Sequence, residues 1–202
     1  MRGAKRILKA PVQAELAFGA AAASRNVRRF ALDATSWVEH HAGWLGAPGT
    51  LLEKLATQMR WEHRSRWMID RHVIEPRLTA EYRVLADCPV SELVAVGLRL
   101  DGLYGVRFGR AWMNLYRDEA DSTSWHADRP ADLLPECIVP VLSLGEARRF
   151  LVRHKHGGPS TPFLVESGDL IVMGGRCQRD WVHAVPKETR AKGSRISINF
   201  AR

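Results

Sequence analysis

The chain has 202 residues, of which 46% are hydrophobic and 26% are charged, and its formal net charge is +8. This length and composition are those of one globular domain with a sizeable core, and they exclude a disordered or fibrous chain. The positive charge is compatible with a polyanionic partner, although a basic surface can serve solubility alone. The three cysteines, Cys88, Cys137 and Cys177, are far apart, which argues against a thiolate zinc site and favours a reducing compartment.

Residues 1–27 are basic and then alanine-rich, without a sustained period, so we expect this segment to be loosely ordered. Pro11 and nearby polar residues interrupt it before the apolar core of a signal peptide can begin. No apolar run approaches the roughly 20 residues that a membrane-spanning helix needs. We therefore expect a cytoplasmic protein with no membrane partner.

The next part of the chain predicts a strand and two helices. Residues 30–38 alternate imperfectly between apolar and polar side chains, which predicts a strand. Thr50 and Glu53 have the spacing of a capping box at the start of a helix with one apolar face over residues 51–59. A second helix is predicted from Ser91, with apolar residues near helical spacing.

Residues 60–71 mix four arginines with two tryptophans and show no clear period. Arginines interleaved with aromatic side chains can follow a phosphate backbone and stack on bases. The alternative is an exposed basic segment whose tryptophans belong to the core. Taken alone, the segment favours this second interpretation.

From Val106 onward the pattern changes to short apolar or alternating runs separated by glycine-containing turns. These runs predict strands at residues 111–116, 137–144, 149–154, 163–166, 170–173, 181–185 and 195–200. Such a succession of short strands is typical of a β-sandwich or jelly roll. Because the N-terminal half contributes helices, the predicted fold class is α+β, mainly β.

His126 and Asp128 are two residues apart, so on a strand or at its end their side chains lie on one face. His183 lies on a predicted strand far downstream, and jelly rolls bring distant strands together. Two imidazoles and one carboxylate are the ligand set of a facial iron(II) site. The His-x-Asp pair alone is a weak signal, because most histidines belong to the surface or the core.

Two neighbouring strands strengthen this interpretation. Alternation places Asn114 and Tyr116 on one face, where an amide and a phenol can bind a small carboxylate. In the last strand, alternation places Arg195, Ser197 and Asn199 on one face. An arginine that points into the protein needs an anion, and its planar guanidinium can bind a carboxylate at two points. The alternative, a solvated polar face, is the better interpretation of the last strand taken alone.

Taken together, these motifs resemble the AlkB family of iron(II)- and 2-oxoglutarate-dependent dioxygenases, from about residue 111 to the C-terminus. The matching motifs are Asn114–Asp118, Trp125–Asp128, Ser143–Gly145, Arg149–Phe150, Gly168–Leu170, Val172–Gly175, Gln178, Trp181–His183, Val185–Lys187 and Arg195–Phe200. The N-terminal half is similar to bacterial members more loosely, in residues 68–71 and 76–77.

The resemblance implies one dioxygenase domain over residues 28–202, with a double-stranded β-helix (jelly-roll) core at 106–202 and helices plus a nucleotide-recognition lid at 28–105. The implied catalytic iron ligands are His126, Asp128 and His183. The implied 2-oxoglutarate contacts are Asn114, Tyr116, Arg195, Ser197 and Asn199, with Arg195 on the distal carboxylate. The implied substrate contacts on the lid are Trp67, Met68, Asp70 and Arg71.

The activity implied by the resemblance is oxidative dealkylation of N-alkylated bases in DNA, or in RNA. Iron(II), O2 and 2-oxoglutarate are used, and succinate, CO2 and an aldehyde are released. The target group is buried in a duplex, so the base must be flipped out or single-stranded. This substrate gives the positive charge a purpose and reverses the interpretation of residues 60–71 in favour of nucleic-acid contact. We expect a monomer.

Two departures from the family pattern leave alternatives open. Ala201 stands where the family usually has a second arginine on 2-oxoglutarate, and Arg202 follows it. Either the strand bulges so that Arg202 substitutes, or the second arginine is missing. Arg129–Pro130 replaces acidic residues near the target base, although Asp132 is close. The first alternative function is therefore the same chemistry on RNA, a protein or a small molecule, and the second is a non-catalytic jelly-roll nucleic-acid-binding protein.

Overall fold

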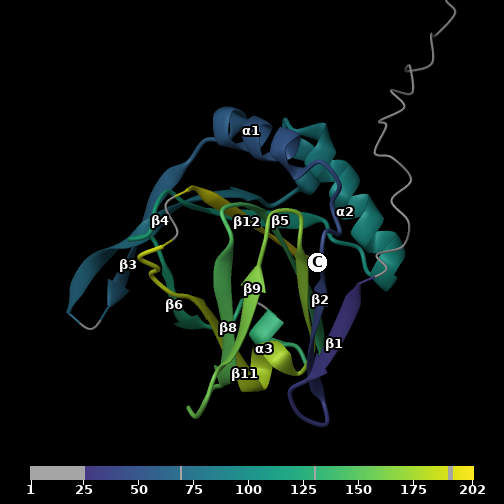
Figure 1. The fold of residues 1–202 in the computed structure, drawn as a ribbon, viewed down its shortest axis with the longest axis vertical. Coiled ribbons are helices and arrows are strands. Elements are labelled where there is room, and N and C mark those ends of the chain that lie inside the picture. The colour runs from purple at the N-terminus through teal and green to yellow at the C-terminus, as the bar shows by residue number, and fades with distance from the viewer. Residues whose placement is uncertain (1–25, 69, 130, 191–192) are drawn as a thin grey trace, which may run out of the picture.

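The computed structural model describes residues 26–202 except 69, 130 and 191–192, so the prediction for residues 1–27 falls almost wholly outside the described residues (Figure 1). The described strands form an antiparallel eight-stranded sheet and a four-stranded sheet. The larger sheet runs β1 (Val27–Ala31), β2 (Ser36–His41), β10 (Leu170–Gly175), β7 (Cys137–Gly145), β12 (Arg195–Ala201), β5 (Arg110–Tyr116), β4 (Arg71–Tyr82) and β3 (Glu62–Met68). The smaller runs β6 (Thr123–His126), β11 (Trp181–Val185), β8 (Arg148–His154) and β9 (Thr161–Val165).

Two longer helices, α1 (Pro48–Gln58) and α2 (Ser91–Tyr104), cover the outer face of the larger sheet, and the smaller sheet lies against its inner face (Figure 1). Shorter helical turns are η1 (Leu85–Asp87), η2 (Ala131–Leu133) and α3 (Cys177–Asp180). This arrangement of two facing antiparallel sheets confirms the predicted jelly-roll core. Every helix in the described ranges is too short or too polar to cross a membrane.

Strand β12 shows how the sequence pattern builds this arrangement. Its apolar residues, Ile196, Ile198 and Phe200, are buried in one cluster with the helix residues Leu55 and Leu93. Burying each such side chain stabilises the fold by roughly 1.5–3 kcal/mol. The alternate residues of the strand point the other way, into the space between the sheets. The predicted alternation is confirmed, and it places the polar face of β12 inside the molecule.

The C-terminal half matches the predicted strands closely. The seven predicted runs correspond to β5, β7, β8, β9, β10, β11 and β12, with ends shifted by at most a few residues. Strand β6 was not among them, because its four residues are too few for a period. It ends at His126, so the His126 and Asp128 pair lies at a strand end, which is one of the two placements expected for it.

The N-terminal half differs from the prediction in three places. The strand predicted at residues 30–38 is wrong, because a turn divides it into β1 and β2. Asp33 Oδ1 accepts hydrogen bonds from the backbone N–H groups of Thr35 and Ser36, each at 2.7 Å. These bonds stabilise a turn in place of a continuous strand. The capping box is also wrong: α1 begins at Pro48, without a side-chain cap, so Thr50 lies inside it.

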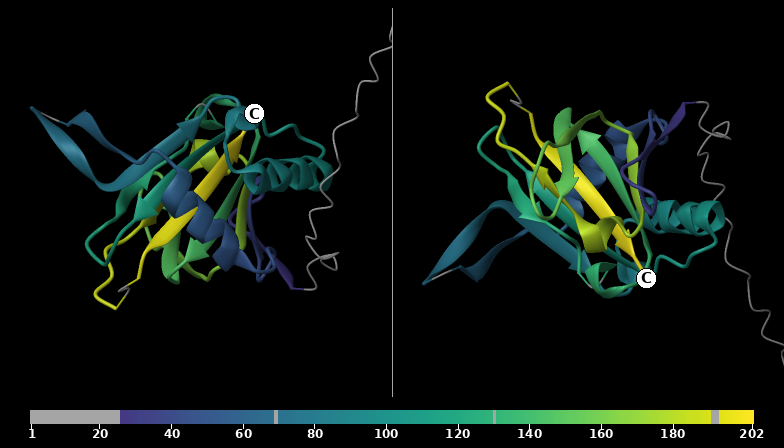
Figure 2. Two further views of the ribbon diagram at one scale, coloured as in Figure 1. Left: turned by 90° about the horizontal axis from the view of Figure 1, so that it is seen from above. Right: turned by 90° about the horizontal axis from the view of Figure 1, so that it is seen from below.

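The third difference concerns residues 60–71, for which no regular element was predicted. They form β3 and the start of β4, a hairpin that projects from the body of the molecule (Figure 2). Its inner end continues as β4 into the larger sheet, where it pairs with β5. The hairpin is therefore joined directly to the strand that carries Asn114 and Tyr116.

Candidate metal centre

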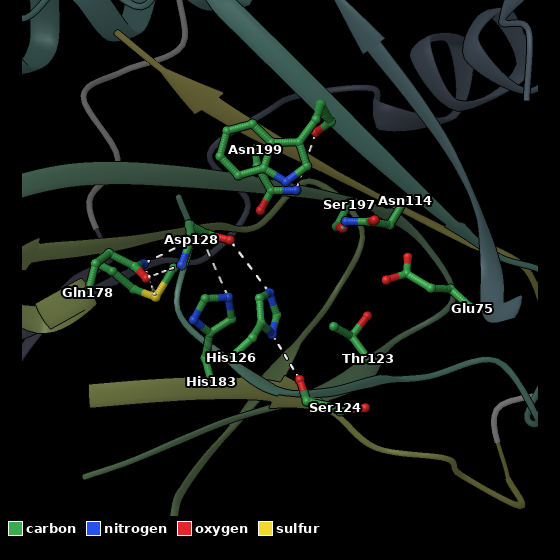
Figure 3. A network of polar contacts seen from close by, with 12 residues as sticks. Glu75, Asn114, Thr123, Ser124, His126, Asp128, Gln178, His183, Ser197 and Asn199 are labelled. Carbon is green, nitrogen blue, oxygen red and sulfur yellow. Dashed lines mark hydrogen bonds and ion pairs between the residues drawn. The ribbon is translucent and has the colours of Figure 1, made fainter. Parts of the chain in front are cut away.

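His126 and His183 are directly opposite each other on the adjacent strands β6 and β11, and their ring centroids are 4.2 Å apart. Asp128 follows the end of β6. Its Oδ1 lies 3.5 Å from His126 Nε2, and its Oδ2 lies 3.6 Å from His183 Nε2 (Figure 3). Within the described residues this is the one His, Cys, Asp and Glu group whose ligand atoms converge, all within 4.8 Å. The structure thus brings the predicted ligands together, and their chemistry fits iron(II).

The surroundings of each histidine prepare its ring for a metal. His126 Nδ1 lies 2.8 Å from the Ser124 carbonyl oxygen. The Nδ1–H group therefore donates a hydrogen bond to this carbonyl, and Nε2 keeps its lone pair for a metal. The His183 ring stacks on Phe150, with centroids 5.2 Å apart and planes 25° apart. Both imidazoles are therefore held with Nε2 toward Asp128.

Protonation at the centre suits cation binding. Burial lowers the pKa of His183 to about 4, so this imidazole is neutral near pH 7. Burial alone would raise the pKa of Asp128, but the two imidazoles and the Arg77 cation hold it below its usual value. Burial opposes charge on His126, yet the Asp128 carboxylate outweighs it and raises the His126 pKa. An ionised carboxylate beside a neutral imidazole is the form that binds a divalent cation.

Every predicted iron ligand and every predicted 2-oxoglutarate contact lines one cavity between the sheets. The cavity is lined by Trp112, Asn114, Tyr116, Thr123, His126, Asp128, Val141, Phe150, His183, Val185, Arg195, Ser197 and Asn199. The polar residues among these come from β5, β6, β11 and β12, and from the loop after β6, which carries Asp128. Two segments that are distant in sequence, residues 110–128 and 181–201, thus supply one site.

Arg195 is the cation of this cavity. It is fully buried, and its Nη2 donates to Ser143 Oγ at 2.7 Å, whereas Nε and Nη1 are buried without a hydrogen-bond partner. Its guanidinium carbon lies 5.3 Å from the centroid of the Tyr116 ring. Burial lowers the pKa of Arg195, since an unpaired buried charge is costly. The donors that Arg195 leaves unused fit an anion, such as a carboxylate of a dianionic co-substrate.

Sequence reasoning missed Arg77 on β4, which contacts the cavity residue Asn114. Its Nε donates to Asn114 Oδ1 at 2.9 Å, and Asn114 Nδ2 donates to Ser197 Oγ at 3.3 Å. Arg77 Nη2 is 3.0 Å from Glu75 Oε2, and both side chains are mostly buried. The Pro76–Arg77 motif was part of the family resemblance, but no spacing in the sequence indicated that Arg77 would touch Asn114.

The structure decides the question of the second arginine. Strand β12 keeps an unbroken register with β5 through the pair Ala201 and Arg110, so the described strand has no bulge. Arg202 is exposed and lines a different, neighbouring cavity with Arg129 and Leu134. Among the described residues, Arg195 is therefore the one arginine that lines the candidate iron cavity.

Three of the predicted lid residues, Trp67, Asp70 and Arg71, are on the projecting hairpin and do not line the cavity. Trp67 is 63% exposed on β3 and its ring meets that of His72 edge-on, with centroids 5.1 Å apart. Asp70 lies in the turn and Arg71 at the start of β4, both exposed. The side chains of Met68 and Asp132 and the whole of Pro130 lie outside the described residues.

Comparison with known proteins agrees with this geometry. Residues 51–200 match the 2OG-Fe(II) oxygenase superfamily. The alpha-ketoglutarate-dependent dioxygenase alkB homolog 3 of Rattus norvegicus is 31% identical over 172 residues, covering 74% of this chain and 58% of that protein. The DNA oxidative demethylase ALKBH2 of Arabidopsis thaliana is 28% identical over 193 residues, covering 75% of this chain and 60% of that protein. The chain spans less than two thirds of the length of these relatives.

Two solved structures share the fold. The structure of OsALKBH1 superposes with a TM-score of 0.59 at 14% identity, covering 87% of this chain and 100% of that chain. A 2OG-Fe(II) oxygenase family oxidoreductase from Burkholderia pseudomallei gives a TM-score of 0.51 at 17% identity, covering 75% of this chain and 76% of that chain. At these identities the likeness concerns the fold alone.

Proposed function

The chain belongs to the 2OG-Fe(II) oxygenase superfamily, and from this premise we propose that it oxidatively dealkylates N-alkylated bases in DNA, and in RNA as a second substrate. His126, Asp128 and His183 would hold iron(II), which supplies oxygen activation when bound. 2-Oxoglutarate is oxidised to succinate and CO2, and the alkyl carbon is hydroxylated and leaves as an aldehyde. The observation that carries the proposal is the convergence of these ligands in one cavity with Arg195 and its unused donors.

Within the cavity, the chain's own residues would bind and orient the co-substrate. We assign its distal carboxylate to Arg195, with Tyr116 beside that cation, and its other polar contacts to Asn114, Ser197 and Asn199. The Tyr116 hydroxyl lies 2.8 Å from Thr123 Oγ1, so the phenol is already held in place. Groups that are already in position lower the cost of ordering the reactants.

We assign recognition of the nucleic-acid strand to the β3–β4 hairpin. Trp67 and Ile74 are large apolar side chains that are 63% and 65% exposed there, and Asp70 and Arg71 lie at the turn. Exposed aromatic and basic side chains on a projecting arm suit stacking on bases and contact with phosphates. The metal ligands lie in a cavity between the sheets, with Asp128 and His183 buried, which supports a single-stranded or flipped-out base as the substrate. Met68, at the end of β3, belongs to the same proposal by its place in the chain.

At the inner end of the hairpin, the Glu75–Arg77 ion pair offers polar atoms for a base edge. Glu75 points toward the cavity side occupied by Thr123 (Figure 3), and Ser122 N–H donates to the Pro76 carbonyl at 3.1 Å. We propose that Glu75 supplies the acidic group that relatives carry in the loop after the metal pair, where this chain has Arg129. Its acceptor oxygens suit a cationic alkylated base that carries an amino group.

All three cysteines are free and buried, which supports the cytoplasm as the compartment. We further propose that residues 28–202 form a single domain, since strands from both halves of the chain share the larger sheet. We propose a monomer as the oligomeric state.

The decisive experiment is incubation with alkylated single-stranded oligonucleotides, iron(II), 2-oxoglutarate and ascorbate. The proposal expects release of the aldehyde and loss of the mark. Turnover of 2-oxoglutarate that is stimulated by a protein or a small molecule, and by no alkylated nucleic acid, would instead select the alternative substrate classes. Salt-dependent DNA binding without oxygen consumption would select a binding protein.

A further inference from the structure

The loop that carries Asp128 is held by a residue that takes no direct part in the proposed ligand set. Asp128 lies beyond the end of β6, so the strand ladder does not account for its backbone N–H. That N–H donates instead to Gln178 Oε1 at 2.8 Å, and Gln178 is almost completely buried on α3. The contact joins two segments 50 residues apart in the chain.

The same amide also reaches the carboxylate. Gln178 Nε2 lies 3.4 Å from Asp128 Oδ2 and 3.2 Å from Met173 Sδ (Figure 3). The backbone N–H fixes which end of the amide is which, because a flipped amide would set its NH2 group against another donor. Each Nε2 hydrogen therefore has one acceptor, and one of them is Oδ2.

The two carboxylate oxygens of Asp128 are thereby made different. Each oxygen faces one imidazole, since Oδ1 lies 3.5 Å from His126 Nε2 and Oδ2 lies 3.6 Å from His183 Nε2, but Oδ2 alone also receives the Gln178 amide. A carboxylate with one oxygen tied to a neighbouring donor offers the other oxygen to a metal. If both oxygens bound, they would occupy a position on the metal that a chelating co-substrate or O2 needs.

We propose that Gln178 is a positioning residue that restricts Asp128 to one-oxygen metal binding through Oδ1. The proposal rests on the proposed function, since it takes His126, Asp128 and His183 as the metal ligands. It gives the buried Gln178 amide a role in keeping the open face of the metal available. The same contacts fix the loop after β6 so that Asp128 stays beside both imidazoles.

The test compares Gln178→Met with Met173→Leu in the full chain. Gln178→Met keeps a similar side-chain length and removes both Asp128 contacts. Met173→Leu removes the second acceptor of the same amide and leaves those contacts in place. Mn(II) affinity is measured by calorimetry, the visible charge-transfer absorption of anaerobic iron(II) with 2-oxoglutarate is recorded, and thermal unfolding is followed without metal.

We expect Gln178→Met to weaken Mn(II) binding about 10–100-fold and to reduce or shift the charge-transfer absorption. Met173→Leu should keep the wild-type metal affinity. A Gln178→Met protein that unfolds at a lower temperature but binds Mn(II) as tightly as wild type would overturn the proposal, because the amide would then serve only the fold. If Gln178→Met does not fold, Gln178→Asn, which keeps an amide one methylene shorter, is judged by the same criteria.

The two hypotheses fail in different ways. Wild-type protein that binds neither Mn(II) nor iron(II) with 2-oxoglutarate would overturn the metal assignment and this inference together. Wild-type binding that Gln178→Met leaves unchanged would overturn only the role of Gln178.

Discussion

His126 and His183 face each other across the β6–β11 pair, with ring centroids 4.2 Å apart. Antiparallel neighbours on one face of a sheet bring side chains to this distance without any bend in the chain. Asp128 then needs only a short excursion past the end of β6 to reach both rings. The centre therefore depends on the pairing of a four-residue strand with a strand far downstream.

Replacing a metal ligand should abolish turnover and metal binding. His126→Ala or Asp128→Ala leaves two ligands where three converge, so we expect Mn(II) affinity to fall by at least about 100-fold, beyond the effect of an outer contact. Calorimetry and the aldehyde-release assay measure the two effects. His156→Ala, at an exposed histidine, is the control. Retained activity in either ligand variant would refute the metal assignment.

Arg195 should carry the affinity for 2-oxoglutarate. Arg195→Met removes the buried cation, and losing one partner of a buried charge pair costs about 2–5 kcal/mol, so the Kd should rise by roughly 30-fold or more. Arg202→Met removes an arginine that lines only other cavities, and its Kd should equal that of wild type. Equal losses in the two variants would show that Arg202 substitutes for the missing second arginine.

The exposed hairpin should bind the nucleic-acid strand. Trp67→Ala removes a stacking surface, and stacking of one base on an aromatic ring contributes about 1–3 kcal/mol. We expect weaker binding of a single-stranded oligonucleotide, by fluorescence anisotropy, with unchanged 2-oxoglutarate affinity. Leu164→Ala, at a residue that is 57% exposed on β9, is the matched control. If both variants bind DNA like wild type, the strand lies elsewhere on the surface.

The β1–β2 turn should lose stability in acid through Asp33. Burial alone would raise the pKa of Asp33, but hydrogen bonds from the Trp181 indole and from Thr35 and Ser36 lower it to about 2. A depressed pKa contributes stability that is complete above the ordinary value of 3.8 and is lost as the pH falls toward 2. Between pH 4 and pH 2, wild type should therefore lose more stability to urea than Asp33→Asn does. Parallel curves for the two proteins would argue against this role.

The sequence by itself determined the C-terminal sheets and the ligand trio. Alternation in residues 195–200 predicted that Arg195, Ser197 and Asn199 share one face, although the strand taken alone favoured a solvated face. The structure places that face inside the cavity. The His-x-Asp pair and the downstream His183 gave the metal chemistry, once the family resemblance supplied the pairing between distant strands.

Only the tertiary structure decided what holds these residues. The Asp33 turn overrode an apparent strand, and the hairpin at residues 62–82 had no readable period because much of it faces solvent on both sides. Two contacts join residues that are far apart in the sequence: Arg77 and Asn114 are separated by 37 positions, and Gln178 and Asp128 by 50. Contacts of this kind leave no periodic trace in a sequence, because they depend on the packing of two sheets rather than on local backbone preference.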